Sequence, residues 1–177
     1  YREEFGSILV GLKKMRRKDR ELSQEEALVI IKDTKMAVLS MISPEGLPYA
    51  TPISPAYIDG KIYFHSSSSE DGVKKSSLIN NGNVILTYVG YNENDLEYLP
   101  QLSVNYVSAM VKGKASLVTD EDKKKTLTVK LSETQFPMAD KKSIEEVYDA
   151  AHKFIDLWEI EISEITGKGR NKHLYFQ

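Results

Sequence analysis

The chain of 177 residues contains no cysteine, which excludes disulfide bonds, cysteine nucleophiles and thiolate metal ligands. It also lacks an excess of one charge: 24 Lys and Arg stand against 26 Asp and Glu. Composition therefore gives no reason to expect binding to nucleic acid or to a membrane surface. No apolar run approaches the roughly 20 residues of a membrane-spanning helix, and no signal peptide is visible at the N-terminus. We expect a soluble, cytoplasmic protein.

Apolar sequence is sufficient for one core. Hydrophobic residues make up 41% of the chain, and this length is typical of a single domain. We expect an N-terminal arm over residues 1–22, a domain over residues 23–168 and a tail over residues 169–177. The last four residues, LYFQ, partly match the end of a protease-cleavage tag, although they can equally be native, so we assign them no function.

The pattern of apolar residues predicts a mainly β (α+β) fold, an antiparallel barrel or sandwich with peripheral helices. Ser23 with Glu26, and Ser143 with Glu146, have the spacing of capping boxes at helix starts. Gly113 within a long strand indicates a bend or bulge. A polar loop is expected over residues 92–101. Helices are predicted at 23–33, 71–81, 119–134 and 143–157, and strands at 35–42, 49–58, 61–66, 83–91, 102–118 and 157–168.

Residues 49–69, YATPISPAYIDGKIYFHSSSS, read as a β-hairpin that turns at Asp59-Gly60. Pro52 and Pro55 are unusual in one strand, because proline donates no hydrogen bond to the ladder. They indicate an edge strand, a bulge, or backbone that contacts something other than a neighbouring strand. The hairpin ends in a histidine and four serines, with two lysines just beyond, and hydroxyls beside ammonium groups suit a phosphate.

Four segments carry a resemblance to a known family. They are MRRKDRELSQEEALVII, GLPYATPISPAYIDGKIYFHSS, GVKKSSLINNGNV and WEIEISEITGK, in this order over about residues 15–168. Together they resemble the FMN-binding split barrel of the pyridoxamine 5′-phosphate oxidase-like superfamily, and within it the nitroimidazole-resistance (Nim) branch. Val73 stands where relatives usually have histidine or arginine, and Gly82 replaces a usual proline. No Arg-Leu-x-Pro ending is present, which argues against a role in vitamin B6 synthesis.

The resemblance implies a homodimer with two FMN sites at its interface. Lys74 matches the family's lysine and is the expected phosphate ligand, with Lys75 its exposed neighbour. His65 would lie near the reactive ring and is the candidate catalytic residue. The expected cofactor-binding residues are Thr51, Pro52, Ile53, Ser54, His65, Ser66, Ser67, Lys74, Tyr106 and Trp158.

Each of these residues also has an ordinary structural interpretation. Lys74 can be a surface lysine, the serines a flexible polar loop, and His65 a structural histidine. Tyr106 and Trp158 can cover the flavin, contact the second subunit or simply belong to the core. Thr51 and Ser54 fall on opposite faces of one strand, so both cannot face one ligand without distortion. The three histidines have no spacing that fits a ligand pair, so no metal site is expected.

The resemblance implies an FMN-dependent oxidoreductase that reduces a small, flat, electron-poor acceptor, with a nitroimidazole-type nitro group as one candidate. In such a protein the flavin carries the redox chemistry, while the chain orients the reactants. A second hypothesis is a flavin carrier or sensor without turnover, which the departure at Val73 keeps open. A third is a haem-binding relative, in which His65 would be an axial ligand.

Overall fold

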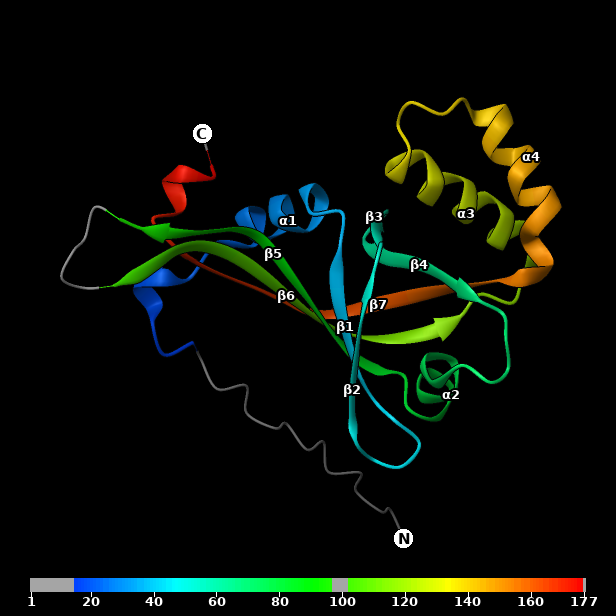
Figure 1. Cartoon of the computed structure of the whole chain (residues 1–177), viewed down its shortest axis with the longest axis horizontal. Coiled ribbons are helices and arrows are strands. Elements are labelled where there is room, and N and C mark those ends of the chain that lie inside the picture. The colour runs from blue at the N-terminus through cyan, green and yellow to red at the C-terminus, as the bar shows by residue number, and fades with distance from the viewer. Residues whose placement is uncertain (1–14, 97–101, 177) are drawn as a thin grey trace, which may run out of the picture.

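The computed structural model describes residues 15–96 and 102–176. Within them, seven strands form one antiparallel sheet in the order β2-β1-β5-β6-β7-β4-β3. The strands are β1 (Ala37–Ile42), β2 (Pro48–Ile53), β3 (Ala56–Ile58), β4 (Lys61–Ser67), β5 (Asn83–Asp95), β6 (Ser103–Leu117) and β7 (Ile155–Arg170). The α-helices are α1 (Gln24–Asp33), α2 (Val73–Asn80), α3 (Glu121–Gln135) and α4 (Lys141–Ala151). The predicted antiparallel fold with peripheral helices is confirmed (Figure 1).

The sheet curls into a split barrel, because a short link in the sequence holds its two edge strands close together. Strands β2 and β3 lie at opposite ends of the strand order, yet only Ser54 and Pro55 separate them. The single strand expected over residues 49–58 is therefore wrong: β2 pairs with β1, and only β3 forms the hairpin with β4. Pro52 is tolerated because β2 is an edge strand, where a missing N–H can face away from the ladder.

The main core fills the interior of the barrel and is closed by α1. Alternate residues of the strands point inward, and Leu39, Leu86, Val111 and Ile160 are fully buried there. Helix α1 presents one apolar side to this core. The predicted capping box starts the helix: the Glu26 N–H donates to Ser23 Oγ (3.1 Å), and the Ser23 N–H donates to Glu26 Oε2 (2.8 Å).

Helices α3 and α4 form a hairpin that packs beside β3, β4 and the start of β7 (Figure 1). A second, smaller core lies beneath α3 and includes Tyr63, Leu131 and Leu157. Helix α4 starts at Lys141 and not at the predicted Ser143, because the Asp140 carboxylate accepts a 3.0 Å hydrogen bond from the Ser143 N–H. The capping box expected at Ser143 is therefore wrong, since an earlier acid caps the helix.

The packed part of the chain extends to both sides of residues 23–168. Leu22 is buried, and β7 continues to Arg170. Lys172 forms a 2.7 Å ion pair with Glu26. Residues 1–14 of the expected arm, and residues 97–101 of the expected loop, lie outside the described residues. Strand β5 occupies the first part of that loop and ends at Asp95. No helix in the described ranges is long and apolar enough to span a membrane.

Gly113 marks a bulge, as predicted, because the pairing of β6 with β7 shifts register between Lys112 and Gly113. A Cβ at Gly113 would lie 2.5 Å from the carbonyl oxygen of Glu161. Only glycine permits this approach of two backbones.

Candidate functional site

The end of β4 separates three predicted site residues by the face on which they lie. His65 and Ser67 are exposed on one face of the strand, and Ser66 between them is buried on the other. In the antiparallel register His65 lies opposite Leu157, and Ser67 lies opposite Ile155. His65 and Ser67 are therefore available to a ligand on the outer face of the sheet.

Ser66 and Trp158 lie in the barrel interior. Trp158 is 1% exposed and stacks on Phe64, with ring centroids 6.4 Å apart. Its indole N–H donates to Ser66 Oγ at 3.0 Å, and that hydroxyl donates to the Ser67 carbonyl oxygen at 3.3 Å. The buried indole needs a partner for its N–H, and Ser66 supplies it, so within this chain both side chains are engaged in the interior.

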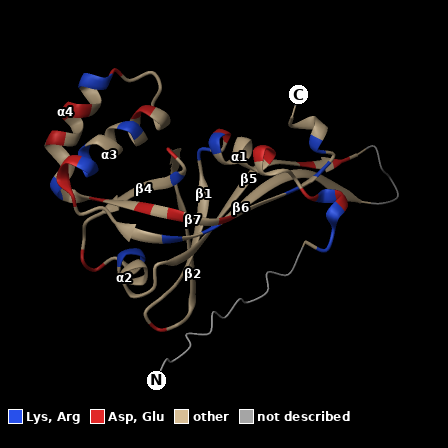
Figure 2. Ribbon diagram, turned by 180° about the vertical axis from the view of Figure 1, so that it is seen from behind, with Lys and Arg blue, Asp and Glu red and all other residues tan. Residues whose placement is uncertain are grey.

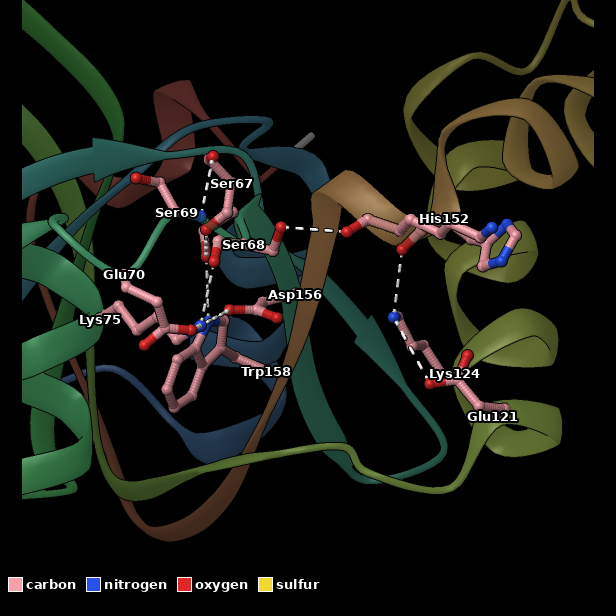
Figure 3. Close-up of polar contacts among 12 residues, drawn as sticks. Ser67, Ser68, Ser69, Glu70, Lys75, Glu121, Lys124, His152, Asp156 and Trp158 are labelled. Carbon is pink, nitrogen blue, oxygen red and sulfur yellow. Dashed lines mark hydrogen bonds and ion pairs between the residues drawn. The ribbon is translucent and has the colours of Figure 1, made fainter.

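Lys75 is not the exposed neighbour that the sequence indicates. It is 9% exposed, and its Nζ lies 2.6 Å from Glu70 Oε1 and 3.0 Å from Asp156 Oδ2. It also donates to the Ser68 carbonyl oxygen at 3.0 Å. Figure 3 shows these groups converging on Nζ beside Trp158. The hydrogen bond from Lys75 to Glu70 is the main cause that raises the lysine's pKa. Lys75 therefore ties the loop between β4 and α2 to β7.

The serine run uses several of its polar groups to hold this loop. The Ser68 hydroxyl donates to the Lys153 carbonyl oxygen (3.1 Å), and the Ser69 N–H donates to Ser67 Oγ (3.2 Å; Figure 3). The Ser67 hydroxyl proton is left for another acceptor. Ser67 is exposed on the same face of β4 as His65, and its hydroxyl can still donate to an external anion.

Lys74 differs from Lys75 in its bonding. Its side chain is half-buried, yet it makes no hydrogen bond or ion pair with any residue within 15–96 and 102–176. Desolvation lowers its pKa. Desolvation also lowers the pKa of His65, and the charge of Lys74 lowers it further. An unpaired cation therefore lies close to a neutral imidazole.

The first turn of α2 adds backbone donors beside Lys74. Gly72 is the N-cap residue of α2 and contributes no side-chain hydrogen bond. The other three α-helices in the described ranges are capped by Ser23, Asp120 and Asp140. The start of α2 is basic and carries no acidic residue (Figure 2). Free N–H groups at a helix N-terminus attract anions. The sequence also leads us to expect backbone N–H groups from the turn into this helix at the phosphate, and Gly72 leaves those groups without a side-chain cap.

Closure of the barrel brings the β2–β3 link toward His65. Ala56 pairs with Tyr63, so the preceding residues run toward the half of β4 that carries His65. Pro52 and Ser54 are exposed here, whereas Ile53 belongs to the core.

Thr51 lies on the opposite face of β2 from Pro52. It is opposite Leu39, on the inner side of the sheet, whereas Pro52 is opposite Val38 on the outer side. Ser54 lies beyond the end of β2, so this register does not place it. Thr51 lies on the opposite side of the sheet from the exposed His65.

Tyr106 is remote from this site within one chain. It pairs with Arg170 at one end of β7, whereas Leu117 of β6 pairs with Trp158 near the other end. Leu117 lies eleven positions after Tyr106 in β6, a span of about 36 Å. Tyr106 is therefore distant from His65 and Lys74 within this chain. The described residues hold no group of three His, Cys, Asp or Glu placed to bind a metal ion.

Comparisons with known proteins give a family and a fold. The family described as pyridoxamine 5′-phosphate oxidase matches residues 23–169. The comparison with curated protein sequences gives no significant match. A candidate 5-nitroimidazole antibiotic resistance protein from Bacteroides thetaiotaomicron superposes with a TM-score of 0.68 and 20% identity, over 84% of this chain and 85% of its own.

Two further structures share the fold. A flavocytochrome from Azotobacter vinelandii has a TM-score of 0.69 and 20% identity, over 89% of this chain and 72% of its own. A FAD and haem binding protein from Mycobacterium smegmatis has a TM-score of 0.68 and 14% identity, over 86% of this chain and 74% of its own. At these identities the likeness shows a common fold.

Proposed function

Because this chain belongs to the pyridoxamine 5′-phosphate oxidase family, we propose that it is an FMN-dependent oxidoreductase whose cofactor lies between the end of β4 and the start of α2. The observation that carries the proposal is Lys74, a half-buried cation without a partner among the described residues, beside His65. An unpaired cation in a partly desolvated position is costly unless an anion binds there.

The groups present fit a phosphate. Lys74 would supply the charge, the free hydroxyl proton of Ser67 a hydrogen bond, and the uncapped N–H groups of α2 further donors. The missing basic residue at Val73 leaves one cation where relatives have two. Ser66 has no part in this cradle because its hydroxyl is bonded to Trp158.

His65 is the residue proposed to serve the reaction. When bound, FMN would supply the transfer of two electrons. The lowered pKa of His65 favours its neutral imidazole, so one ring nitrogen can donate a hydrogen bond and the other can accept one. We place His65 beside the acceptor, as a hydrogen-bonding group that orients it. The acceptor class is small, flat and electron-poor, with a nitroimidazole-type nitro group as the case to test.

A homodimer completes the proposed site. Val38, Thr87 and Met110 lie side by side on the outer face of three neighbouring strands, and Val38 and Met110 are 38% and 41% exposed. This partly apolar row is the surface that we propose for the dimer contact. It would allow Tyr106, remote in its own chain, to approach the flavin of a second copy.

Two other functions share these residues and are separable by experiment. A flavin carrier would bind FMN through Lys74 but would not accelerate its reactions. A haem protein would use the neutral imidazole of His65 as an axial ligand. In that case added haem would give a Soret band that disappears in His65→Ala.

The proposal is tested by comparing FMN with riboflavin, which lacks the phosphate. We expect wild-type protein to bind FMN at least about tenfold more tightly, because a charge-assisted phosphate contact contributes about 1.5–3 kcal/mol. Lys74→Met should remove this difference, and the exposed Lys114→Met should preserve it. Absence of FMN binding, or equal binding of the two flavins by wild-type protein, would overturn the proposal. Faster reaction of bound reduced flavin with a nitroimidazole than of free FMN would distinguish an enzyme from a carrier.

A further inference from the structure

A pocket of about 290 Å³ lies between α3, α4 and the first residue of β7, apart from the proposed flavin site. None of its nine lining side chains is charged. Phe136 and Val147 form part of its wall and are 61% and 67% exposed, so the pocket is open to solvent at an apolar rim. Small-molecule sites typically combine such an apolar lining with a few placed polar groups.

Two buried hydroxyls supply those polar groups. Thr128 of α3 and Tyr148 of α4 both line the pocket and are 6% and 4% exposed. Neither Thr128 Oγ1 nor the Tyr148 hydroxyl has a hydrogen-bond partner within the described ranges. Buried polar groups are rarely left unsatisfied in folded proteins. Two such groups, on facing helices and in the wall of one pocket, indicate that a ligand satisfies them.

We propose that this pocket binds a small, neutral molecule with an apolar body and one polar group that hydrogen-bonds to Thr128 and Tyr148. A charged ligand is disfavoured, because no lining group would compensate for its loss of hydration. The volume is about twice that of an engineered apolar cavity of about 150 Å³ that takes benzene. The ligand is therefore of the size of a substituted phenol or a small cyclic ketone.

The inference goes beyond the proposed flavin chemistry and does not depend on it. The pocket shares no lining residue with the group of His65, Ser67 and Lys74. It does adjoin that group, because its wall residue Ile155 lies opposite Ser67 in the β4–β7 register. Because the two sites share no residue, they can be loaded and tested separately, with and without FMN.

Three probes of similar shape test the chemistry. Thymol carries a hydroxyl on an alkylated ring, p-cymene lacks that hydroxyl, and p-isopropylbenzoate carries a negative charge instead. We expect calorimetric titration to show thymol binding about tenfold more tightly than p-cymene, and no binding of p-isopropylbenzoate. The titrations are made with and without saturating FMN, and the thymol affinity should be the same in both.

Hydroxyl-removing variants locate the site. Tyr148→Phe and Thr128→Val should each weaken thymol binding about three- to tenfold while leaving p-cymene unchanged. Their melting temperatures should not fall, because each removes an unpaired buried hydroxyl. Matched controls are Tyr91→Phe, a partly buried tyrosine outside the pocket that is bonded to Glu93, and Thr134→Val on α3, and both should bind thymol normally.

Several results would overturn the inference. Equal affinity for thymol and p-cymene would mean a non-specific apolar surface, with water satisfying the two hydroxyls. Displacement of thymol by FMN, or thymol binding that neither hydroxyl variant changes, would place the probe elsewhere. Absence of thymol binding would leave no ligand of this class for the pocket.

Discussion

The indole N–H of Trp158 donates a 3.0 Å hydrogen bond to the hydroxyl of Ser66, although the two residues are 92 positions apart. This bond turns one serine of the run inward and leaves Ser67 on the opposite face. Neighbouring serines of identical chemistry thus have different roles, one in stability and one in the proposed anion site.

Variants of these two serines should separate those roles. Ser66→Ala leaves the buried indole N–H unpaired, so we expect the free energy of unfolding to fall by about 1–2 kcal/mol with FMN affinity nearly unchanged. Ser67→Ala should leave stability within about 0.5 kcal/mol and weaken FMN binding. Urea unfolding and flavin fluorescence titration of both variants measure this. The reverse pattern would show that Ser66 faces the cofactor.

Adjacent lysines should behave in opposite ways. Lys75→Met leaves Asp156 without its buried counter-charge, and we expect a loss of about 3 kcal/mol in the free energy of unfolding. Adding Asp156→Asn should recover part of this loss, because no charge is then left uncompensated. Lys74→Met, one position away, should not reduce stability, since Lys74 has no partner in the described part of the chain. Equal losses in the two lysine variants would contradict the assigned pairing.

The pKa of His65 should respond to the charge of Lys74. Desolvation and the charge of Lys74 hold it below the ordinary value of 6.5. Lys74→Met should raise it part of the way back, whereas the distant Lys114→Met should not. NMR titration of the His65 ring signals in flavin-free protein measures this.

His65 should also make the free energy of unfolding depend on pH, with stability falling as the pH falls. Because the folded pKa lies below 6.5, the unfolded chain takes up its proton first as the pH falls. The contribution of His65 to stability is therefore present above about pH 6.5 and is lost below it. His65→Gln should reduce this part of the pH dependence, and an unchanged profile would argue against a lowered pKa.

Glu159 should contribute to stability through three donors. Burial alone would raise its pKa, but hydrogen bonds from Lys123, Lys61 and Tyr63 outweigh burial and hold the pKa at about 2. Glu159→Gln should lower the free energy of unfolding at pH 7 by about 2 kcal/mol.

The difference in free energy of unfolding between wild type and Glu159→Gln should disappear at low pH. A steric effect of the substitution would persist at every pH. The folded pKa is depressed, so the contribution of Glu159 is complete above the ordinary value of 4.5 and is lost as the pH falls toward 2. Chemical unfolding of wild type and Glu159→Gln across this range measures the difference. The exposed Glu161→Gln serves as the control and should show little difference from wild type at any pH.

A charge on the outer sheet face should disrupt the proposed dimer. Met110→Glu places a carboxylate in the row with Val38, so we expect sedimentation to show a shift from dimer to monomer and FMN binding to weaken at least about tenfold. Met138→Glu, at a position 96% exposed beside α3, should change neither property. A wild-type monomer, or a dimer unaffected by Met110→Glu, would contradict this surface.

The sequence by itself determined the local elements. Alternating residues defined most strands and the Ser23–Glu26 spacing defined the start of α1, because each depends on residues close together in the chain. Gly113 also marked the bulge, because glycine is the residue that permits the close approach of β7 there. It also pointed to the segment that holds the candidate site, through the serines and Lys74 after β4. The Ser143 cap failed because a stronger local competitor, Asp140, lay just before it.

Only the tertiary structure decided which of these groups a ligand can reach. Trp158 lies in the core and binds Ser66, Lys75 is paired with Asp156, and Lys74 has no partner among the residues that the structure describes. These outcomes depend on the β4–β7 register and on the closure of a barrel whose edge strands are consecutive in the sequence. Pairing across about ninety positions leaves no local pattern, so no property of the serine-lysine segment alone could show it.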